Sequence, residues 1–178
     1  RHMQLRKMID RWGDNHGPTA VLDHGANPGL VSHFTKQALL QISRRIIEDR
    51  PRNRRVPALR RAIERLSFNE LAMLSGVKVI HISERDTQTS NMPKSADEFV
   101  NTWSIEGLYE EGIAPAELGW GTHEKALPPE GREHEFGSKA AIYLMRPGAG
   151  TRVRSWTPTA RAQHAWLITH NEAISIAD

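Results

Sequence analysis

Cysteine is absent from this chain of 178 residues. Its absence excludes disulfides, thiolate metal ligands and a cysteine nucleophile. The sequence also lacks a run of about 18 apolar residues, the length that a membrane-spanning helix needs. Aromatic residues make up only 6% of the chain, whereas hydrophobic residues reach 38% and charged residues 25%. These values are typical of a soluble globular domain with its own core, and we expect a cytoplasmic protein without a membrane partner.

Two glycine-rich phosphate loops are missing as well. No Gly-x-Gly-x-x-Gly follows a predicted strand, and no Gly-Lys-Ser or Gly-Lys-Thr occurs. The first of these motifs holds the pyrophosphate of a dinucleotide at a helix N-terminus. An NAD enzyme built from this chain alone would therefore lack its usual pyrophosphate cradle.

The net charge of +3 conceals two segments of opposite sign. Residues 36–65 hold ten Lys or Arg and three Asp or Glu, a local balance of +7. Residues 84–135 hold four Lys or Arg and twelve Asp or Glu, a local balance of −8. The basic segment lacks interleaved aromatics, so we interpret it as a solvated helix face and loop and expect no nucleic-acid partner. The acidic segment suits a cationic ligand, because the electrostatic field of its carboxylates raises the local concentration of such a ligand.

Helices are predicted mainly in the first half of the chain and strands in the second. Apolar residues at helical spacing predict helices over 1–12, over 30–47 and, as one or two elements, over 58–74, with Gly76 as a C-terminal cap. A short helix is predicted from the N-cap Ser104 to Gly112. Strands are predicted over 19–23, 77–82, 98–103, 116–120, 140–145, 151–157 and 163–169. This order favours an α+β fold with a mainly antiparallel sheet and flanking helices over a doubly wound fold.

Glycine-containing segments predict two loops. Residues 24–29, His-Gly-Ala-Asn-Pro-Gly, form a tight loop in which glycine permits backbone angles closed to other residues. Residues 121–137 are rich in Gly, Pro, His and Glu and are expected to form an irregular functional loop. The two His/Glu groups in this second loop match neither His-Glu-x-x-His nor a closed zinc pattern. We therefore expect no metal site.

Three positions are candidates for chemistry on residue type alone. Glu84 follows a predicted strand, where it either points into a cleft or forms a surface ion pair with Arg85. Trp103 is either a core residue or, beside the acidic residues that follow it, part of an alkylammonium site. His170 follows the last predicted strand and either exchanges a proton near neutral pH or bonds to the backbone.

Six strings of the sequence resemble the bacterial homospermidine synthase family, which is similar to saccharopine dehydrogenases. The resemblance covers about residues 17–178 and is weakest over 41–75. The strings are His24–Leu39, Gly76–Gln88, Phe99–Gly107, Pro115–Lys125, Arg132–Gly137 and Thr169–Asp178.

The resemblance implies an N-terminal Rossmann domain that holds NAD, followed by an α+β domain that binds polyamines and forms a homodimer. Residues 1–16 are then a remnant helix of the preceding domain, and 17–178 are the substrate-binding and dimerisation domain, with the Rossmann domain absent from this chain. The implied reaction oxidises putrescine to an imine by hydride transfer to NAD. Ammonia leaves, a second putrescine condenses, and the new imine is reduced to sym-homospermidine. We expect this part alone to bind amines without turning them over.

The resemblance also implies roles for single residues. Trp103 is the indole that stabilises substrate cations, Glu84 and Glu111 hold the amine ends, and His170 belongs to the same pocket. A separate set meets the cofactor: Asn27 lies between nicotinamide and amine, and Pro28 and Gly29 shape its loop.

Two other functions remain open at this point. A carboxynorspermidine or saccharopine dehydrogenase-like reductase must hold a substrate carboxylate, so arginines should line its pocket. The excess of acidic residues around Trp103 argues against that reaction. The chain is alternatively a non-catalytic polyamine-binding or dimerisation module.

Overall fold

The structure is a computed structural model that describes residues 2–14, 17–22, 24–82, 88–98, 100–101, 103–121, 123–157 and 160–178. In chain order its elements are α1 (His2–Trp12), α2 (Leu30–Asp49), α3 (Val56–Glu64), α4 (Phe68–Ser75), α5 (Ile105–Ile113), β1 (Pro115–Gly119), β2 (Gly131–Glu133), β3 (Ala141–Pro147), the 3-10 helix η1 (Gly148–Gly150), β4 (Arg152–Thr157), β5 (Ala160–Trp166) and α6 (Glu172–Ala177).

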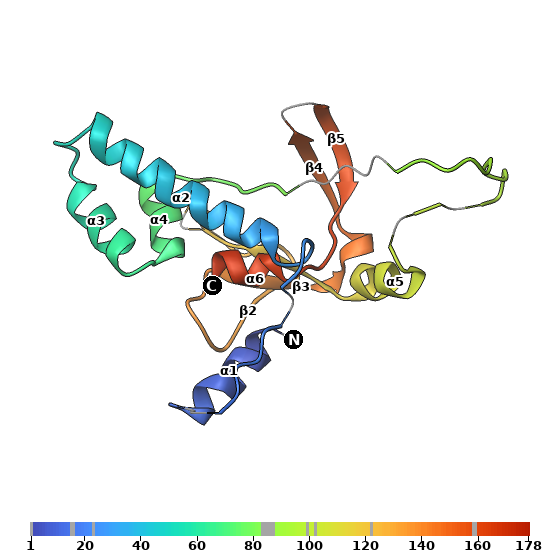
Figure 1. The fold of residues 1–178 in the computed structure, drawn as a ribbon, viewed down its shortest axis with the longest axis horizontal. Helices are drawn as coiled ribbons and strands as arrows, with labels where there is room; N and C mark the ends of the chain where they lie inside the picture. The colour runs from blue at the N-terminus through green and yellow to red at the C-terminus, as the bar shows by residue number, and fades with distance from the viewer. Residues whose placement is uncertain are drawn as a thin grey trace.

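Helices α2, α3 and α4 form one end of the molecule (Figure 1). Leu59 and Leu71 are fully buried in the core that these helices share, to which α2 contributes Leu39 and Ile47. Phe34 and Ile42, two of the apolar residues whose spacing predicted α2, are instead 58% and 45% exposed. The chain leaves α4 through Gly76, whose φ of 80° lies in the left-handed region that glycine adopts readily. Two predictions are thereby confirmed: the long helix that begins at Leu30, and a pair of helices followed by a glycine cap.

Strands β1, β3 and β2 form a three-stranded antiparallel sheet with β3 in the centre. Successive side chains of a strand point to opposite faces of the sheet. Ala116 and Ile142 are therefore buried on one face. Glu117 and Tyr143, which are paired across β1 and β3, lie on the other face. That second face carries Ala141, which packs against Met3 of α1 and Ile174 of α6.

Helix α6 connects the two halves of the molecule. It contacts α2 and α4 as well as β1 and β3, and it lies at the centre of the ribbon in Figure 1. A hydrogen bond of 2.6 Å between the hydroxyls of Ser32 and Ser175 joins α2 to α6. Arg6 of α1 forms a 2.9 Å ion pair with Asp178, directly after α6. The sequence patterns did not predict α6, because six residues are too few for helical periodicity to be recognised.

Strands β4 and β5 form a separate two-stranded hairpin. The hairpin projects from the rest of the molecule in Figure 1. Trp156 and Trp166 are 54% and 58% exposed on it. An isolated hairpin is marginally stable in water, so a projecting hairpin with exposed indoles is a surface that another element can cover.

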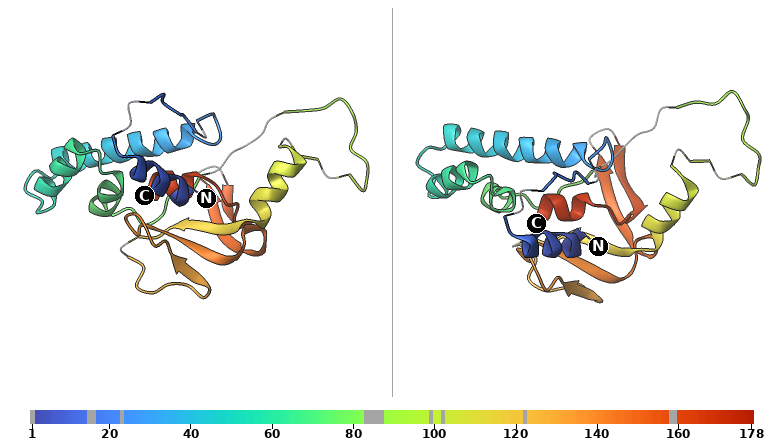
Figure 2. Two further views of the ribbon diagram at one scale, coloured as in Figure 1. Left: turned by 90° about the horizontal axis from the view of Figure 1, so that it is seen from below. Right: turned by 60° about the horizontal axis from the view of Figure 1, so that its bottom comes forward.

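Three predicted strands are wrong for the residues that the structure describes. Residues 19–22, 77–82 and the described part of 98–103 form no strand. Figure 2 shows residues 88–98 extending away from the rest of the chain. Val79 is 55% exposed and Ile82 42% exposed, so apolar β-formers alone did not produce a strand without a neighbour to pair with.

The remaining predictions in the second half hold with smaller changes. The strands predicted over 116–120, 140–145 and 151–157 correspond to β1, β3 and β4, whereas β5 begins and ends three residues before the predicted 163–169. The loop over 121–137 is irregular except for the short strand β2. Helix α5 ends at Ile113, one residue past the predicted end at Gly112, which is buried within the helix. The α+β architecture is therefore confirmed.

Candidate functional site

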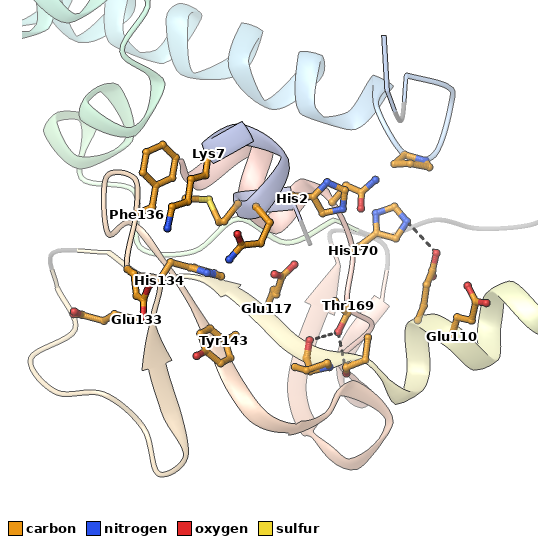
Figure 3. A pocket seen from close by; sticks show the side chains of 18 of the residues that line it. His2, Lys7, Glu110, Glu117, Glu133, His134, Phe136, Tyr143, Thr169 and His170 are labelled. Carbon is orange, nitrogen blue, oxygen red and sulfur yellow. Dashed lines mark hydrogen bonds and ion pairs between the residues drawn. The ribbon is translucent and has the colours of Figure 1, made fainter. Parts of the chain in front are cut away.

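A cavity of about 590 Å³ lies over the second face of the sheet. Its walls come from α1, from α5, from the segment between β2 and β3, and from the residues just before α6 (Figure 3). Five of the described side chains that line it are carboxylates, one is a lysine and none is an arginine. The carboxylates are those of Glu110, Glu111, Glu117, Glu133 and Glu135, and the lysine is Lys7. The cavity is therefore suited to a cation.

A row of polar groups runs along one end of the cavity. The Nε2 atom of His170 lies 3.8 Å from Oε1 of Glu111, the contact that a dashed line marks in Figure 3. The Nδ1 atom of His170 is hydrogen-bonded to Oε2 of Glu172. The other oxygen of Glu172, Oε1, accepts a 2.9 Å hydrogen bond from the backbone N–H of Gly29. Helix α5, the start of α6 with the residues before it, and the loop before α2 thus meet through three side chains and one amide.

Glu172 is the most enclosed member of this row, with a side chain only 5% exposed. Burial opposes its ionisation, but the hydrogen bonds from Gly29 and His170 outweigh burial and hold the pKa of Glu172 below its ordinary value. Glu172 is therefore a buried carboxylate whose two oxygens both have hydrogen-bond donors.

Glu111 differs from Glu172 because one of its carboxylate oxygens can still accept a hydrogen bond. Its Oε2 atom is buried and has no hydrogen-bond partner in the described part of the chain. Thr169 fixes the neighbouring backbone, because its hydroxyl donates a 2.6 Å hydrogen bond to the carbonyl of Pro115, at the start of β1. A buried carboxylate oxygen without a donor costs free energy unless a ligand supplies the donor. Glu111 is thus the clearest attachment point for an ammonium group.

The other end of the cavity has a second carboxylate. Glu117 lies on the floor of the cavity between His170 on one side and His134 on the other (Figure 3). Burial raises the pKa of Glu117 and lowers the pKa of His134, because each group loses solvation for its charged form. The ring of His134 lies 5.1 Å from the ring of Tyr143, centroid to centroid.

The loop over 24–29 closes tightly next to this site. The N–H of Gly25 donates a 2.7 Å hydrogen bond to the carbonyl of Pro28, and the N–H of Leu30 donates a 2.9 Å hydrogen bond to the carbonyl of Gly25. Gly29 has a φ of 129°, a value that side chains disfavour, so the predicted need for glycine in this loop is met at this position. Pro28 lines the cavity, and Asn27 is exposed in the same loop.

Of the side chains expected to hold the amine, Glu111 and His170 lie together at one end of the cavity. Trp103 is 40% exposed, directly precedes the N-cap of α5, and is not among the residues that line the cavity. Ser104 caps α5 as predicted, accepting a 2.9 Å hydrogen bond from the N–H of Gly107. Glu84 lies outside the described residues.

Sequence reasoning missed two residues of this site. Glu172 is only two positions after His170, but nothing in the sequence shows that its carboxylate reaches the backbone of Gly29, 143 residues earlier. Glu117 is a lone carboxylate in a short strand, and its place on the cavity side follows only from the register with Tyr143.

Within the described ranges, no three His, Cys, Asp or Glu side chains are grouped closely enough to hold a metal ion. None of the described helices is both long and apolar enough to cross a membrane.

Comparison with known proteins identifies the relatives of this chain. It is 52% identical to the homospermidine synthase of Mesorhizobium japonicum over 178 residues, which is all of this chain and 35% of the relative. It is 55% identical over 164 residues to the homospermidine synthase of Blastochloris viridis, covering 91% of this chain and 32% of the relative. The chain thus spans about a third of the length of these relatives, and the resemblance inferred from the sequence is confirmed.

A solved structure agrees with the sequence matches. The homospermidine synthase of Legionella pneumophila in complex with NAD superposes with a TM-score of 0.70 at 47% identity, covering 99% of this chain and 36% of that chain. Residues 25–178 match the family described as saccharopine dehydrogenase C-terminal domain. This chain therefore belongs to the saccharopine dehydrogenase C-terminal domain family.

Proposed function

We propose that this chain is the amine-binding part of an NAD-dependent homospermidine synthase, which converts two putrescine molecules to sym-homospermidine and ammonia through imine intermediates. One observation carries the proposal: five carboxylates and no arginine are found among the described residues that line the cavity. Putrescine is a dication at neutral pH, and carboxylates supply the charge-assisted hydrogen bonds that it needs. The curated relatives named above point to the same reaction.

Within this proposal, Glu111 receives one ammonium end of the substrate. Its buried, unpartnered Oε2 gains the donor that it lacks, and the adjacent His170 provides a group that exchanges a proton with the amine. From the family resemblance we further propose that Glu84 holds another amine end and that Trp103, which lies before α5 and outside the cavity lining, stabilises the cationic intermediate through its ring face. A cation over an indole gains about 0.5–2 kcal/mol, and more where water is excluded.

We propose NAD as the cofactor, with most of its site in a preceding domain. This chain has no Gly-x-Gly-x-x-Gly to cradle the pyrophosphate. What it offers is the loop of Asn27, Pro28 and Gly29, whose glycine conformation permits close backbone approach. Bound NAD supplies the hydride acceptor and later the donor. Asn27 then lies between nicotinamide and amine, and Pro28 brings the loop to the cavity wall.

A reductase that handles a carboxylated amine is the second candidate, and the cavity argues against it. Such an enzyme needs a guanidinium or a similar cation to pair with the substrate carboxylate. Lys7 is the only lysine or arginine among the described residues that line the cavity. A non-catalytic polyamine-binding role is the remaining alternative, and turnover distinguishes it.

The chain boundaries and assembly are further parts of the proposal. We propose that residues 1–16 belong to the preceding domain and that 17–178 form the substrate-binding and dimerisation domain of a cytoplasmic homodimer. The projecting hairpin supports dimerisation, because Trp156 and Trp166 are more than half exposed on it. Exposed indoles are typical of surfaces that a partner covers.

The experiment that tests the function is product analysis with the longer protein that contains this chain. Incubation with putrescine and NAD should yield sym-homospermidine and ammonia in equal amounts, with no net NADH formed. The 178-residue chain alone should bind putrescine and give no product. Net NADH consumption with a carboxylated substrate would replace this proposal with the reductase, and binding without turnover in the longer protein would leave only the binding module.

A further inference from the structure

The two ring nitrogens of His170 face different surroundings. Nε2 is directed to Glu111, 3.8 Å away, at the wall of the cavity. Nδ1 contacts the buried Oε2 of Glu172. The remaining titratable groups that line the same cavity are His2 and Lys7 on α1, Glu110 on α5, Glu117, Glu133 and Tyr143 on the sheet, and His134 and Glu135 directly after β2. Among the residues that the structure describes, Glu172 is the hydrogen-bond partner of Nδ1.

The hydrogen bonds of Glu172 determine which nitrogen carries the proton. An ionised carboxylate only accepts hydrogen bonds, and Oε1 already accepts one from the N–H of Gly29. Its Oε2 therefore accepts from His170, and Nδ1 must be the donor. A neutral imidazole has one N–H, so its Nε2 is left with a lone pair facing the cavity.

We propose that Glu172 is a positioning residue that keeps the proton of neutral His170 on Nδ1, so that Nε2 accepts a proton from an ammonium group bound at Glu111. This inference rests on the proposed function, since it assumes that an amine occupies the cavity. In the step, the N–H bond of the ammonium breaks and its electron pair stays on the amine nitrogen. The proton goes to Nε2 and forms an imidazolium between Glu172 and Glu111. No electron is gained or lost by the protein.

The transfer gives the substrate what imine chemistry requires. A protonated amine has no lone pair, so it can neither assist departure of a hydride from its carbon nor attack an imine. A positioned base that removes the proton typically contributes about 10²–10⁴-fold to the rate. The carboxylate of Glu172 then stabilises the imidazolium without taking its proton, the role that a buried carboxylate behind a catalytic histidine has in other enzymes.

Glu172 also fixes the position of the loop. Gly29, whose N–H it binds, is the N-cap of α2 and ends the loop that contains Asn27 and Pro28. One carboxylate therefore holds both the histidine and the loop. Loss of the Oε2 acceptor should change the location of the proton on His170, whereas loss of the Oε1 acceptor should release the loop.

The decisive variant is Glu172→Gln. A glutamine side chain has one acceptor oxygen and one donor amide group. If its oxygen keeps the hydrogen bond from Gly29, its NH₂ faces Nδ1 of His170, which must then be the acceptor. The proton of the neutral ring moves to Nε2, and the lone pair is no longer directed to the cavity. The matched control is Glu133→Gln, which changes charge in the same cavity.

The measurement is long-range ¹H–¹⁵N correlation NMR of His170 in the 178-residue chain at a pH where the ring is neutral, without amine. The expected result is an Nδ1–H tautomer in the unmodified chain and in Glu133→Gln, and an Nε2–H tautomer in Glu172→Gln. An Nε2–H tautomer in the unmodified chain overturns the proposal, and so does an unchanged tautomer in Glu172→Gln. If that variant does not fold, the unmodified chain alone still decides the question.

A second readout separates this proposal from the proposed function. In the longer protein, Glu172→Gln should lower kcat about 10²-fold or more with a KM for putrescine close to that of the unmodified enzyme, because Glu111 remains. A KM for putrescine that rises by as large a factor as kcat falls overturns the proton-positioning role. Failure of the unmodified protein to bind putrescine refutes the proposed function, whereas the tautomer result stands independently of it.

Discussion

Replacing Glu111 by glutamine should weaken putrescine binding more than any other single removal of charge from α5. The side chain of Glu111 is 33% exposed, but its Oε2 is buried and has no hydrogen-bond partner in the described part of the chain. In the proposed complex this oxygen accepts a charge-assisted hydrogen bond from an ammonium group. Glutamine keeps the size of the side chain and removes its charge, so the loss reports the charge interaction and not a cavity.

The size of the effect follows from the burial of that oxygen. A hydrogen bond to a charged group contributes about 1.5–3 kcal/mol net, and partial exposure of Glu111 places the value in the lower half of that range. Since about 1.4 kcal/mol corresponds to tenfold in Kd, putrescine should bind about 10- to 40-fold more weakly. The assay is isothermal titration calorimetry of the 178-residue chain at low ionic strength, where charge interactions are least screened.

Glu106→Gln is the control for long-range electrostatics. Glu106 lies on the same helix, is exposed, and does not line the cavity. Both variants lose the same charge, so the difference in Kd between them isolates the local contact at Glu111. Equal Kd values for the two variants, whether both weakened or both unchanged, would refute the assignment of Glu111 as an amine ligand.

Three further predictions concern stability and assembly. Because burial raises the folded-state pKa of Glu117 above its ordinary 4.5, its ionisation opposes folding as pH rises through that pKa. Glu117→Gln should therefore raise Tm at pH 8 and have little effect at pH 4, and an equal effect at both pH values contradicts the burial argument. Leu59→Ala should cost about 2–5 kcal/mol in urea unfolding, because Leu59 is fully buried, whereas Met73→Ala, at a position 46% exposed, should cost under about 1 kcal/mol. Trp156→Glu and Trp166→Glu should convert the proposed dimer to a monomer in sedimentation velocity, and a dimer unchanged by both substitutions would remove the hairpin from the interface.

Local rules predicted the elements that depend on neighbours in sequence. Ser104 caps α5 because its hydroxyl reaches an amide three residues away, and Gly76 ends α4 because it adopts the left-handed conformation. Helical spacing was sufficient to predict α2, because a helix also forms through residues close to one another in sequence. The strand predicted over 77–82 failed because a strand depends on a partner and on burial, and Val79 is 55% exposed.

The candidate site likewise contains residues that the sequence indicated and residues that only the fold brings in. Residue chemistry and resemblance pointed to Glu111 and His170, which the fold does bring together. Neither could reveal that Glu172 completes the row, since its hydrogen bond to Gly29 joins residues 143 positions apart. The position of Glu117 on the cavity floor likewise follows from sheet register, which hydrophobic alternation specifies weakly in a strand of five residues.

The central claim is that this cavity is built for a diamine, and its most direct test compares putrescine with ornithine, the same carbon chain carrying an additional carboxylate. Calorimetric titration of the 178-residue chain with each ligand under identical conditions measures both affinities. The account predicts that putrescine binds and that ornithine binds more than about tenfold more weakly, because its carboxylate meets Glu111 and Glu117 and no arginine among the described lining residues. Equal or tighter binding of ornithine would contradict it.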